Sequence, residues 1–323
     1  MPIAELGYRH WKGSLRDPWL RWLAITKTGA RLAFKSALLR RLLFMSWFPV
    51  LVFAGVFFVV GLLTDQSWSD NGAVGMLRRT LGDSMMFALR DDPQSVRLAI
   101  WSLIFFFQSF YQIFLCMLIT AIVGPPLISV DVQSKAFLVY FSRPITRFEY
   151  LLGKAAVLLI FLFAAGLLPA LCIYAVSVLF SPGVEVILQT GITVPRIFLA
   201  SLAIAVPATT VMLFYSSLTG SRRYASIGWM STWLLGEFGY MVMSANFEDA
   251  GWTFLLSIRK TISVAVRSIF DVEGSLQQFW GSDQIYERLG SSYSSTLAFG
   301  WLAGVTLVCL IVIYRRISAP MRI

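Results

Sequence analysis

Six long apolar segments constrain this chain more than any other feature of its sequence. They cover roughly residues 42–63, 98–123, 155–180, 197–218, 225–243 and 297–314. A helix rises about 1.5 Å per residue, so segments of this length can cross the roughly 30 Å of hydrocarbon in a bilayer. Only 14% of the residues are charged, whereas soluble proteins carry about 25%. The sequence therefore predicts an all-α integral membrane protein with six transmembrane helices in a single domain over residues 42–318.

Basic residues are distributed unevenly around these segments. Eighteen of the 27 Lys and Arg, with four acidic residues, lie in the segments 1–41, 124–154, 219–224 and 315–323. The connections on the other side carry nine basic and twelve acidic residues. Cytoplasmic loops are enriched in Lys and Arg, so we expect both termini, 1–41 and 319–323, in the cytoplasm. Six is an even number of spans, which places both termini on the same side of the membrane and so agrees with this expectation. The expected location is a bacterial inner (plasma) membrane. The net charge of +10 then orients the chain, and we expect no nucleic-acid partner.

Few residues are available for catalysis or metal binding. His10 is the only histidine, and Cys116, Cys172 and Cys309 lie in different apolar segments without the spacing of metal ligands. The sequence contains no GxxxxGK(S/T) phosphate-binding loop. We therefore expect no catalytic site, no metal site and no cofactor bound by this chain, which would not itself be an enzyme.

Short amphipathic segments flank the apolar ones. Residues 19–41 combine aromatic and aliphatic residues with basic ones, which predicts an interfacial helix along the inner leaflet. The alternative is a first span with a continuous cytoplasmic extension. In the outer connections, residues 77–88 and 255–269 each have an apolar helical face. These two segments predict short interfacial or shallow re-entrant helices on the outer face.

The loop between the second and third spans predicts a helix, a break and a second helix. Ser129 is placed to cap the first helix, whose N-terminal end would favour the Asp131 carboxylate. Phe137 and Phe141 then share an apolar face, and Asp131 and Lys135 point away from it. This pattern predicts one amphipathic helix from Ser129 to the end of the loop's first half.

The break and the second helix have their own local signals. Pro144 ends the first helix because it disfavours helical geometry at Arg143. Thr146 and Glu149 have the spacing of a capping box, which starts the helix that continues into the third span. The loop is either an ordinary interfacial connector or a rigid docking element for a cytoplasmic partner. Aromatic residues beside basic ones are typical of an interface anchor.

The sequence of this loop, GPPLISVDVQSKAFLVYFSRPITRFEYLLGK, resembles the second-loop signature of ABC-2 type transporter permeases. The matching residues are Asp131, Ser142, Arg143, Pro144, Arg147, Tyr150, Gly153 and Lys154. The six-span plan, the N-terminal interfacial helix and the large last outer loop also fit this family. The resemblance implies the transmembrane subunit of an ATP-binding-cassette exporter.

This resemblance also implies partners and a site. The loop would be a coupling helix that lies in a groove of a separate cytoplasmic ATPase subunit, and that subunit would bind ATP and Mg. Two copies of the permease, or two related subunits, would form the pathway between them, in contact with membrane lipid. The expected coupling residues are Asp131, Lys135, Phe137, Phe141, Arg143, Pro144, Arg147 and Glu149.

Glu237 is the only acidic residue within a predicted span. It lies about a dozen residues into the fifth span, roughly 18 Å from the inner edge. A charge at this depth is expensive and usually faces a cavity or a partner. Glu237 is therefore a candidate for the substrate pathway, together with Gln108 and Gln112, which are four residues apart on one face of the second span. The alternative is a neutral acid that is hydrogen-bonded within the bundle, or one near the outer surface.

The sequence is also compatible with two functions other than an exporter subunit. A secondary transporter driven by an ion gradient would use Glu237 as its ion or proton site, although such carriers usually have more intramembrane charges and more spans. A non-transporting membrane anchor would use the 124–154 loop only as a scaffold for a cytoplasmic protein.

Overall fold

A computed structural model of the chain describes residues 20–64, 93–136, 145–180, 185–247, 251–275 and 293–318. Within these ranges the fold is all-helical, with no strand. The helices are α1 (Arg21–Phe34), α2 (Ala37–Met45), α3 (Phe48–Thr64), α6 (Pro93–Val123), α7 (Pro125–Gln133), α9 (Arg147–Ala165), α10 (Leu167–Leu179), α11 (Glu185–Thr190), α12 (Thr193–Leu218), α13 (Arg222–Asn246), the 3-10 helix η3 (Thr253–Leu256), α14 (Ile258–Ile269) and α17 (Ser295–Ser318). The prediction of an all-α membrane protein is confirmed at this level.

Five helical segments in the described residues are long and apolar enough to cross a membrane. They are Ala37–Phe58, Leu98–Gln133, Arg147–Leu179, Val186–Leu218 and Ser295–Ile317. These segments coincide with five of the six predicted spans. The remaining predicted span, 225–243, lies within α13, which is long enough but is less apolar than the other five.

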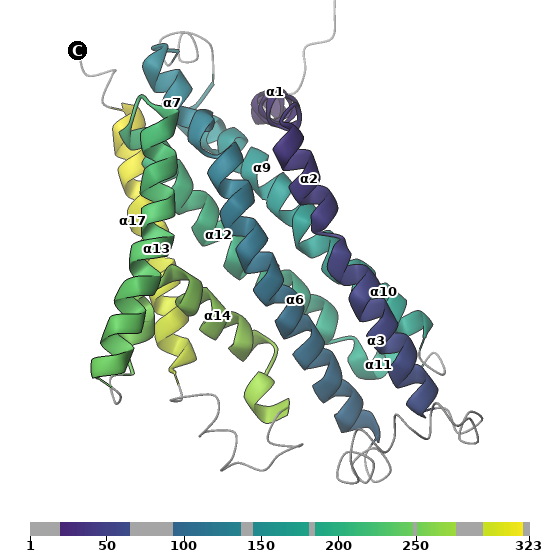
Figure 1. The fold of residues 1–323 in the computed structure, drawn as a ribbon. Coiled ribbons are helices and arrows are strands. Elements are labelled where there is room, and N and C mark those ends of the chain that lie inside the picture. Colours follow the sequence, from purple (N-terminus) through teal and green to yellow (C-terminus); the bar gives the residue numbers. More distant parts are fainter. Residues whose placement is uncertain are drawn as a thin grey trace, which may run out of the picture.

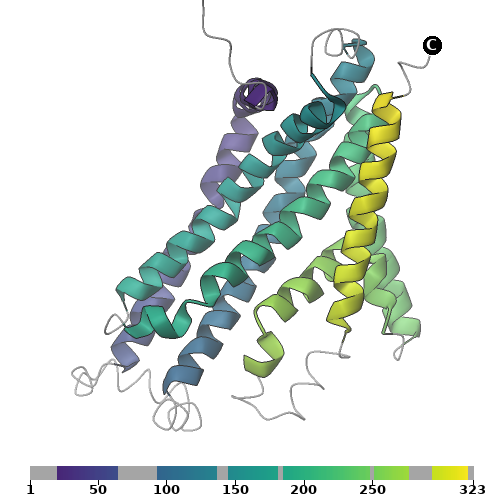
Figure 2. The ribbon, with the colours of Figure 1, turned by 180° about the vertical axis from the view of Figure 1, so that it is seen from behind.

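The long helices lie side by side in one bundle around α12 (Figure 1). Seen from behind, α12 runs between α9 and α10 on one side and α17 on the other (Figure 2). Its buried face is rich in small residues, including Ala200, Ala205 and Ala208. Small residues let helix backbones approach closely, which is how helices associate in a membrane.

Helix α1 lies across one end of the bundle, nearly perpendicular to the long helices, and is seen end-on in Figure 1. We call this the α1 end. The chain separates α1 from α2 at Lys35 and Ser36, where the Ser36 hydroxyl accepts a hydrogen bond from the Leu39 amide and caps α2. The predicted separate helix is therefore confirmed, but residues 37–41 belong to the first span rather than to α1. A continuous extension of the first span is not observed.

Two of the long helical segments are interrupted. The second bends at Gly124, where an added Cβ would lie 2.1 Å from Met212 Cγ on α12. The third is divided at Gly166, where an added Cβ would lie 1.8 Å from the Gln112 amide nitrogen. A larger residue at Gly124 would require Met212 to move, and one at Gly166 would require the flexible Gln112 side chain to move.

After α13 ends at the opposite end of the bundle, η3 and α14 return between the long helices. Helix α14 packs against α17, α12, α13 and α6. Its residues Ile262 and Ala265 are fully buried. The predicted helix at 255–269 is confirmed as η3 and α14, which pack within the bundle. Its place at the outer face of a membrane stays a prediction. The other predicted outer helix, 77–88, lies outside the described residues.

Candidate functional site

At the α1 end, a buried ion pair joins the two helices that flank the 137–144 segment. Lys154 Nζ on α9 lies 2.8 Å from Asp131 Oδ2 on α7, and each side chain is only 11% exposed. The Tyr150 hydroxyl donates a 2.6 Å hydrogen bond to the same carboxylate oxygen. These contacts balance the charge of Asp131 and tie α7 to α9.

The position of Asp131 contradicts the prediction for this residue. Helix α7 begins at Pro125, not at Ser129, because Pro is well suited to the first turn of a helix. Ser129 lies in the middle of α7 and donates its hydroxyl to the Pro125 carbonyl oxygen at 2.6 Å. Asp131 therefore lies near the C-terminal end of α7, where the helix dipole disfavours a carboxylate. Lys154 supplies the cation that this position needs.

The predicted helix across the first half of the loop is also interrupted. Helix α7 ends at Gln133, and Lys135 has a φ of 53°, in the left-handed region that commonly ends helices. Lys135 is exposed, as predicted. Four predicted coupling residues, Phe137, Phe141, Arg143 and Pro144, lie outside the described residues.

The start of α9 confirms the predicted capping box. The Thr146 hydroxyl accepts from the Glu149 amide at 3.2 Å, and the Thr146 amide donates to Glu149 Oε2 at 2.7 Å. Arg147 is the first residue of α9. Both Arg147 and Glu149 are half-buried, so they lie beside the loop at the surface of the α1 end.

Helix α12 holds α7 through one serine. The Ser216 hydroxyl oxygen accepts hydrogen bonds from the Ile128 and Ser129 amides, each at 3.0 Å, and donates to the Pro125 carbonyl oxygen at 2.7 Å. Ser216 thus gives two buried amides near the start of α7 a side-chain acceptor. Sequence reasoning did not assign this role, since nothing local relates Ser216 to the 125–129 segment.

Helix α1 is held on α9 by close backbone contact. The Thr26 hydroxyl donates to the Gly153 carbonyl oxygen at 3.1 Å. An added Cβ at Gly153 would lie 3.0 Å from the Trp22 carbonyl oxygen, and one at Gly29 would lie 2.7 Å from Val157 Cγ2. Glycine on both sides therefore allows the two helices to touch.

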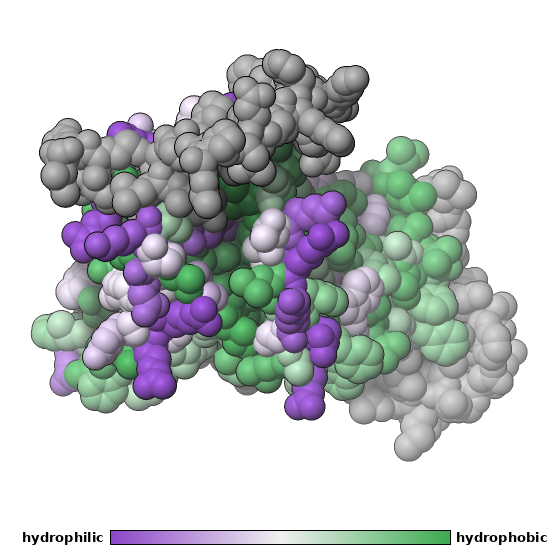
Figure 3. All heavy atoms as spheres, turned by 90° about the horizontal axis from the view of Figure 1, so that it is seen from above, coloured by the Kyte–Doolittle hydropathy of each residue, from purple (hydrophilic) through white to green (hydrophobic). Residues whose placement is uncertain are grey.

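A groove of about 730 Å³ opens between α1 and the junction of α6 and α7. Its charged lining residues are Arg21, Asp131, Lys154 and Arg222. Viewed onto this end, hydrophilic side chains form groups with hydrophobic surface between them (Figure 3).

Glu237, on α13, is paired rather than free. Arg259 on α14 approaches both of its carboxylate oxygens, with Nε 2.9 Å from Oε2, and the Ser257 hydroxyl donates to Oε2 at 2.7 Å. The side chains of Glu237 and Arg259 are 32% and 27% exposed. The Arg259 guanidinium also lies over the Phe110 ring on α6, at 5.8 Å. The ion pair therefore lies at the surface between α13, α14 and α6.

The two predicted pathway amides lie in the interior of the bundle, whereas the Glu237 side chain is about one-third exposed. Gln108 and Gln112 are both buried on α6. Gln112 packs on Gly166 at the break between α9 and α10. The Gln108 amide nitrogen and oxygen have no hydrogen-bond partner within the described part of the chain. The predicted shared face is thus confirmed, but it points into the bundle.

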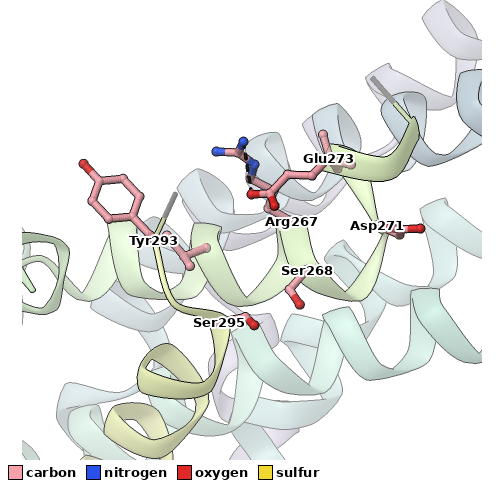
Figure 4. A pocket seen from close by; sticks show the side chains of 8 residues that line it. Arg267, Ser268, Asp271, Glu273, Tyr293 and Ser295 are labelled. Carbon is pink, nitrogen blue, oxygen red and sulfur yellow. Dashed lines mark ion pairs between the residues drawn. The ribbon is translucent and has the colours of Figure 1, made fainter. Parts of the chain in front are cut away.

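A smaller polar pocket, of about 100 Å³, lies near the opposite end (Figure 4). Arg267 extends from α14 toward Glu273, and their nearest atoms are 3.3 Å apart. Tyr293 and Ser295, at the start of α17, line another side. Within the described residues, no group of three or more His, Cys, Asp and Glu side chains is placed to hold a metal ion.

No protein-family model matches the sequence, and no curated protein matches it.

Proposed function

We propose that the chain is the transmembrane permease subunit of an ATP-driven ABC exporter in a bacterial inner membrane, with both termini in the cytoplasm. The observation that carries the proposal is the buried contact of Asp131 with Lys154 and Tyr150. It joins α7 to α9, the helices on either side of the 137–144 segment. A force applied to that segment would move both helices together.

The same contacts extend the connection into the bundle. Ser216 joins α7 to α12, and Thr26 joins α1 to α9. Packed elements that move as units are the usual means by which a local displacement reaches a distant site. In this proposal, a cytoplasmic ATPase subunit binds ATP and Mg and displaces the loop. This chain then transmits the displacement to four helices.

The Glu237–Arg259 pair supports a pathway beside α13. About a third of the Glu237 side chain is exposed, and contact of a charge with lipid at membrane depth is expensive. We propose that α13 is the sixth span and that its exposed face meets a second permease subunit or water. Its weak apolarity agrees with a helix that is shielded from lipid. The path of the chain also favours six crossings, because α13 leads away from the α1 end and α17 returns to it (Figure 1).

The ion-gradient carrier is the second candidate, and the geometry favours it less. A proton or ion site needs a carboxylate that can exchange its counter-ion, whereas Glu237 already accepts from Arg259 and Ser257. The non-transporting anchor does not account for an exposed charge pair inside the predicted membrane region.

The test is affinity purification of the tagged full chain from its native membranes, followed by an ATPase assay. We expect a stoichiometric ATPase that co-purifies and couples to transport in proteoliposomes. Phe137→Ala and Arg143→Ala should reduce coupling, while Arg223→Ala, at an exposed position on α13, serves as the control. A chain that purifies without an ATPase would overturn the proposal. Transport driven by an ion gradient would then support the carrier, and its absence would support the anchor.

A further inference from the structure

The groove at the α1 end has a chemical character that the coupling role does not use. Three of its lining residues are basic, namely Arg21, Lys154 and Arg222, and one, Asp131, is acidic. Lys154 already neutralises Asp131 at 2.8 Å. Arg21 and Arg222 supply the other two basic side chains of the lining.

The arginines come from different parts of the chain. Arg21 begins α1, and Arg222 begins α13. Glu149 lies near enough to Arg21 to interact with it electrostatically, but it does not line the groove. A guanidinium binds phosphate through a planar fork of N–H donors, so two arginines at one groove favour a phosphate group.

The other walls are apolar. Ile25 and Leu32 of α1 line the groove together with Ile122 of α6 and Leu127 of α7. Leu32 is 66% exposed, although a leucine of a soluble protein gains by burial. Basic groups beside an open apolar channel match a ligand with an anionic head and a hydrocarbon body.

We propose that this groove binds an anionic phospholipid of the inner leaflet. Arg21 and Arg222 attract its anionic head, and an acyl chain lies along Leu32 and Leu127. The position of the groove favours lipid over a free anion, because α1 is an amphipathic helix across the end of the bundle with exposed apolar residues. The proposal does not require the ATPase partner, so it can fail or succeed independently of the exporter function.

The experiment measures binding of phosphatidylglycerol and phosphatidylcholine with the same acyl chains to the full chain in detergent, by native mass spectrometry. We expect tighter binding of phosphatidylglycerol. Arg21→Gln and Arg222→Gln should each weaken it by about fivefold, the effect of one basic residue near an anionic lipid. The matched control is Arg223→Gln, because Arg223 is the exposed neighbour of Arg222 and does not line the groove.

A second variant tests the apolar wall. Ala24 is exposed on α1 and lines the groove, so Ala24→Phe should narrow it and weaken binding of both lipids without unfolding the chain. Equal affinity for the two lipids would overturn the proposal. So would an equal loss in Arg222→Gln and Arg223→Gln, since that indicates diffuse surface charge. Displacement of the lipid by millimolar inorganic phosphate would indicate a site for the free anion.

Discussion

Lys154 on α9 lies 2.8 Å from Asp131 on α7, and both side chains are almost entirely buried. An ion pair in such a position contributes little net stability, because both charges have lost their water. Its consequence is positional: neither helix can move away from the other without exposing an unpaired charge.

Lys154→Met should destabilise the chain by about 3–5 kcal/mol, because it leaves Asp131 buried without a cation. Adding Asp131→Asn should recover part of the loss, since no buried charge then remains. Thermal unfolding of the full chain in detergent measures both effects. Lys135→Met is the control, because Lys135 is an exposed lysine of the same loop. Unchanged stability in Lys154→Met would show that the ion pair does not hold α7 and α9 together.

Ser216→Ala should cost about 1–3 kcal/mol, because the amides of Ile128 and Ser129 lose their side-chain acceptor in a buried place. Ser217→Ala is a close control. Ser217 is also buried, but its hydroxyl donates only to the Phe214 carbonyl oxygen of its own helix. The free energy of unfolding in both variants gives the comparison, and equal losses would contradict the role assigned to Ser216.

Gly236→Ala should force η3 away from α13. The added Cβ would lie 2.8 Å from the Leu256 carbonyl oxygen, which is backbone and cannot rotate away. Such overpacking costs about 1–3 kcal/mol. Gly239 on the same helix has nothing within 4 Å of an added Cβ, so Gly239→Ala should stabilise by up to about 1 kcal/mol. The thermal unfolding temperature should therefore fall in Gly236→Ala and rise in Gly239→Ala. Shifts in the same direction would contradict the position of η3 against α13.

Glu237→Gln should destabilise the chain, because Arg259 loses its anionic partner beside the Phe110 ring. Glu237→Gln with Arg259→Gln should be more stable than Glu237→Gln alone, since the unpaired cation is gone. The measurement is the thermal unfolding temperature, in detergent, of the unchanged chain, of Glu237→Gln and of the double variant. A double variant no more stable than the single one would mean that Arg259 is already satisfied without Glu237.

Local patterns were predicted well where the cause was local. The capping box of Thr146 and Glu149 involves residues three apart, so its spacing alone predicts the start of α9. The start of α7 was also available from the sequence, because Pro125 and Pro126 favour the first turn of a helix. The prediction was wrong because it preferred the cap at Ser129. The apolar segments predicted five membrane-crossing helices because burial in lipid depends on composition and length.

The sequence by itself determined that the chain forms long apolar helices, that α1 is amphipathic and that α9 begins at its capping box. Only the tertiary structure decided the partners of the polar side chains. Each partner comes from another helix: Asp131 pairs with Lys154, Glu237 pairs with Arg259, and the start of α7 is bound by Ser216. Most buried polar atoms in folded proteins are hydrogen-bonded, because an unpaired one has lost its water without replacement. Sequence spacing identifies the need, and the packing of distant helices selects the residue that meets it.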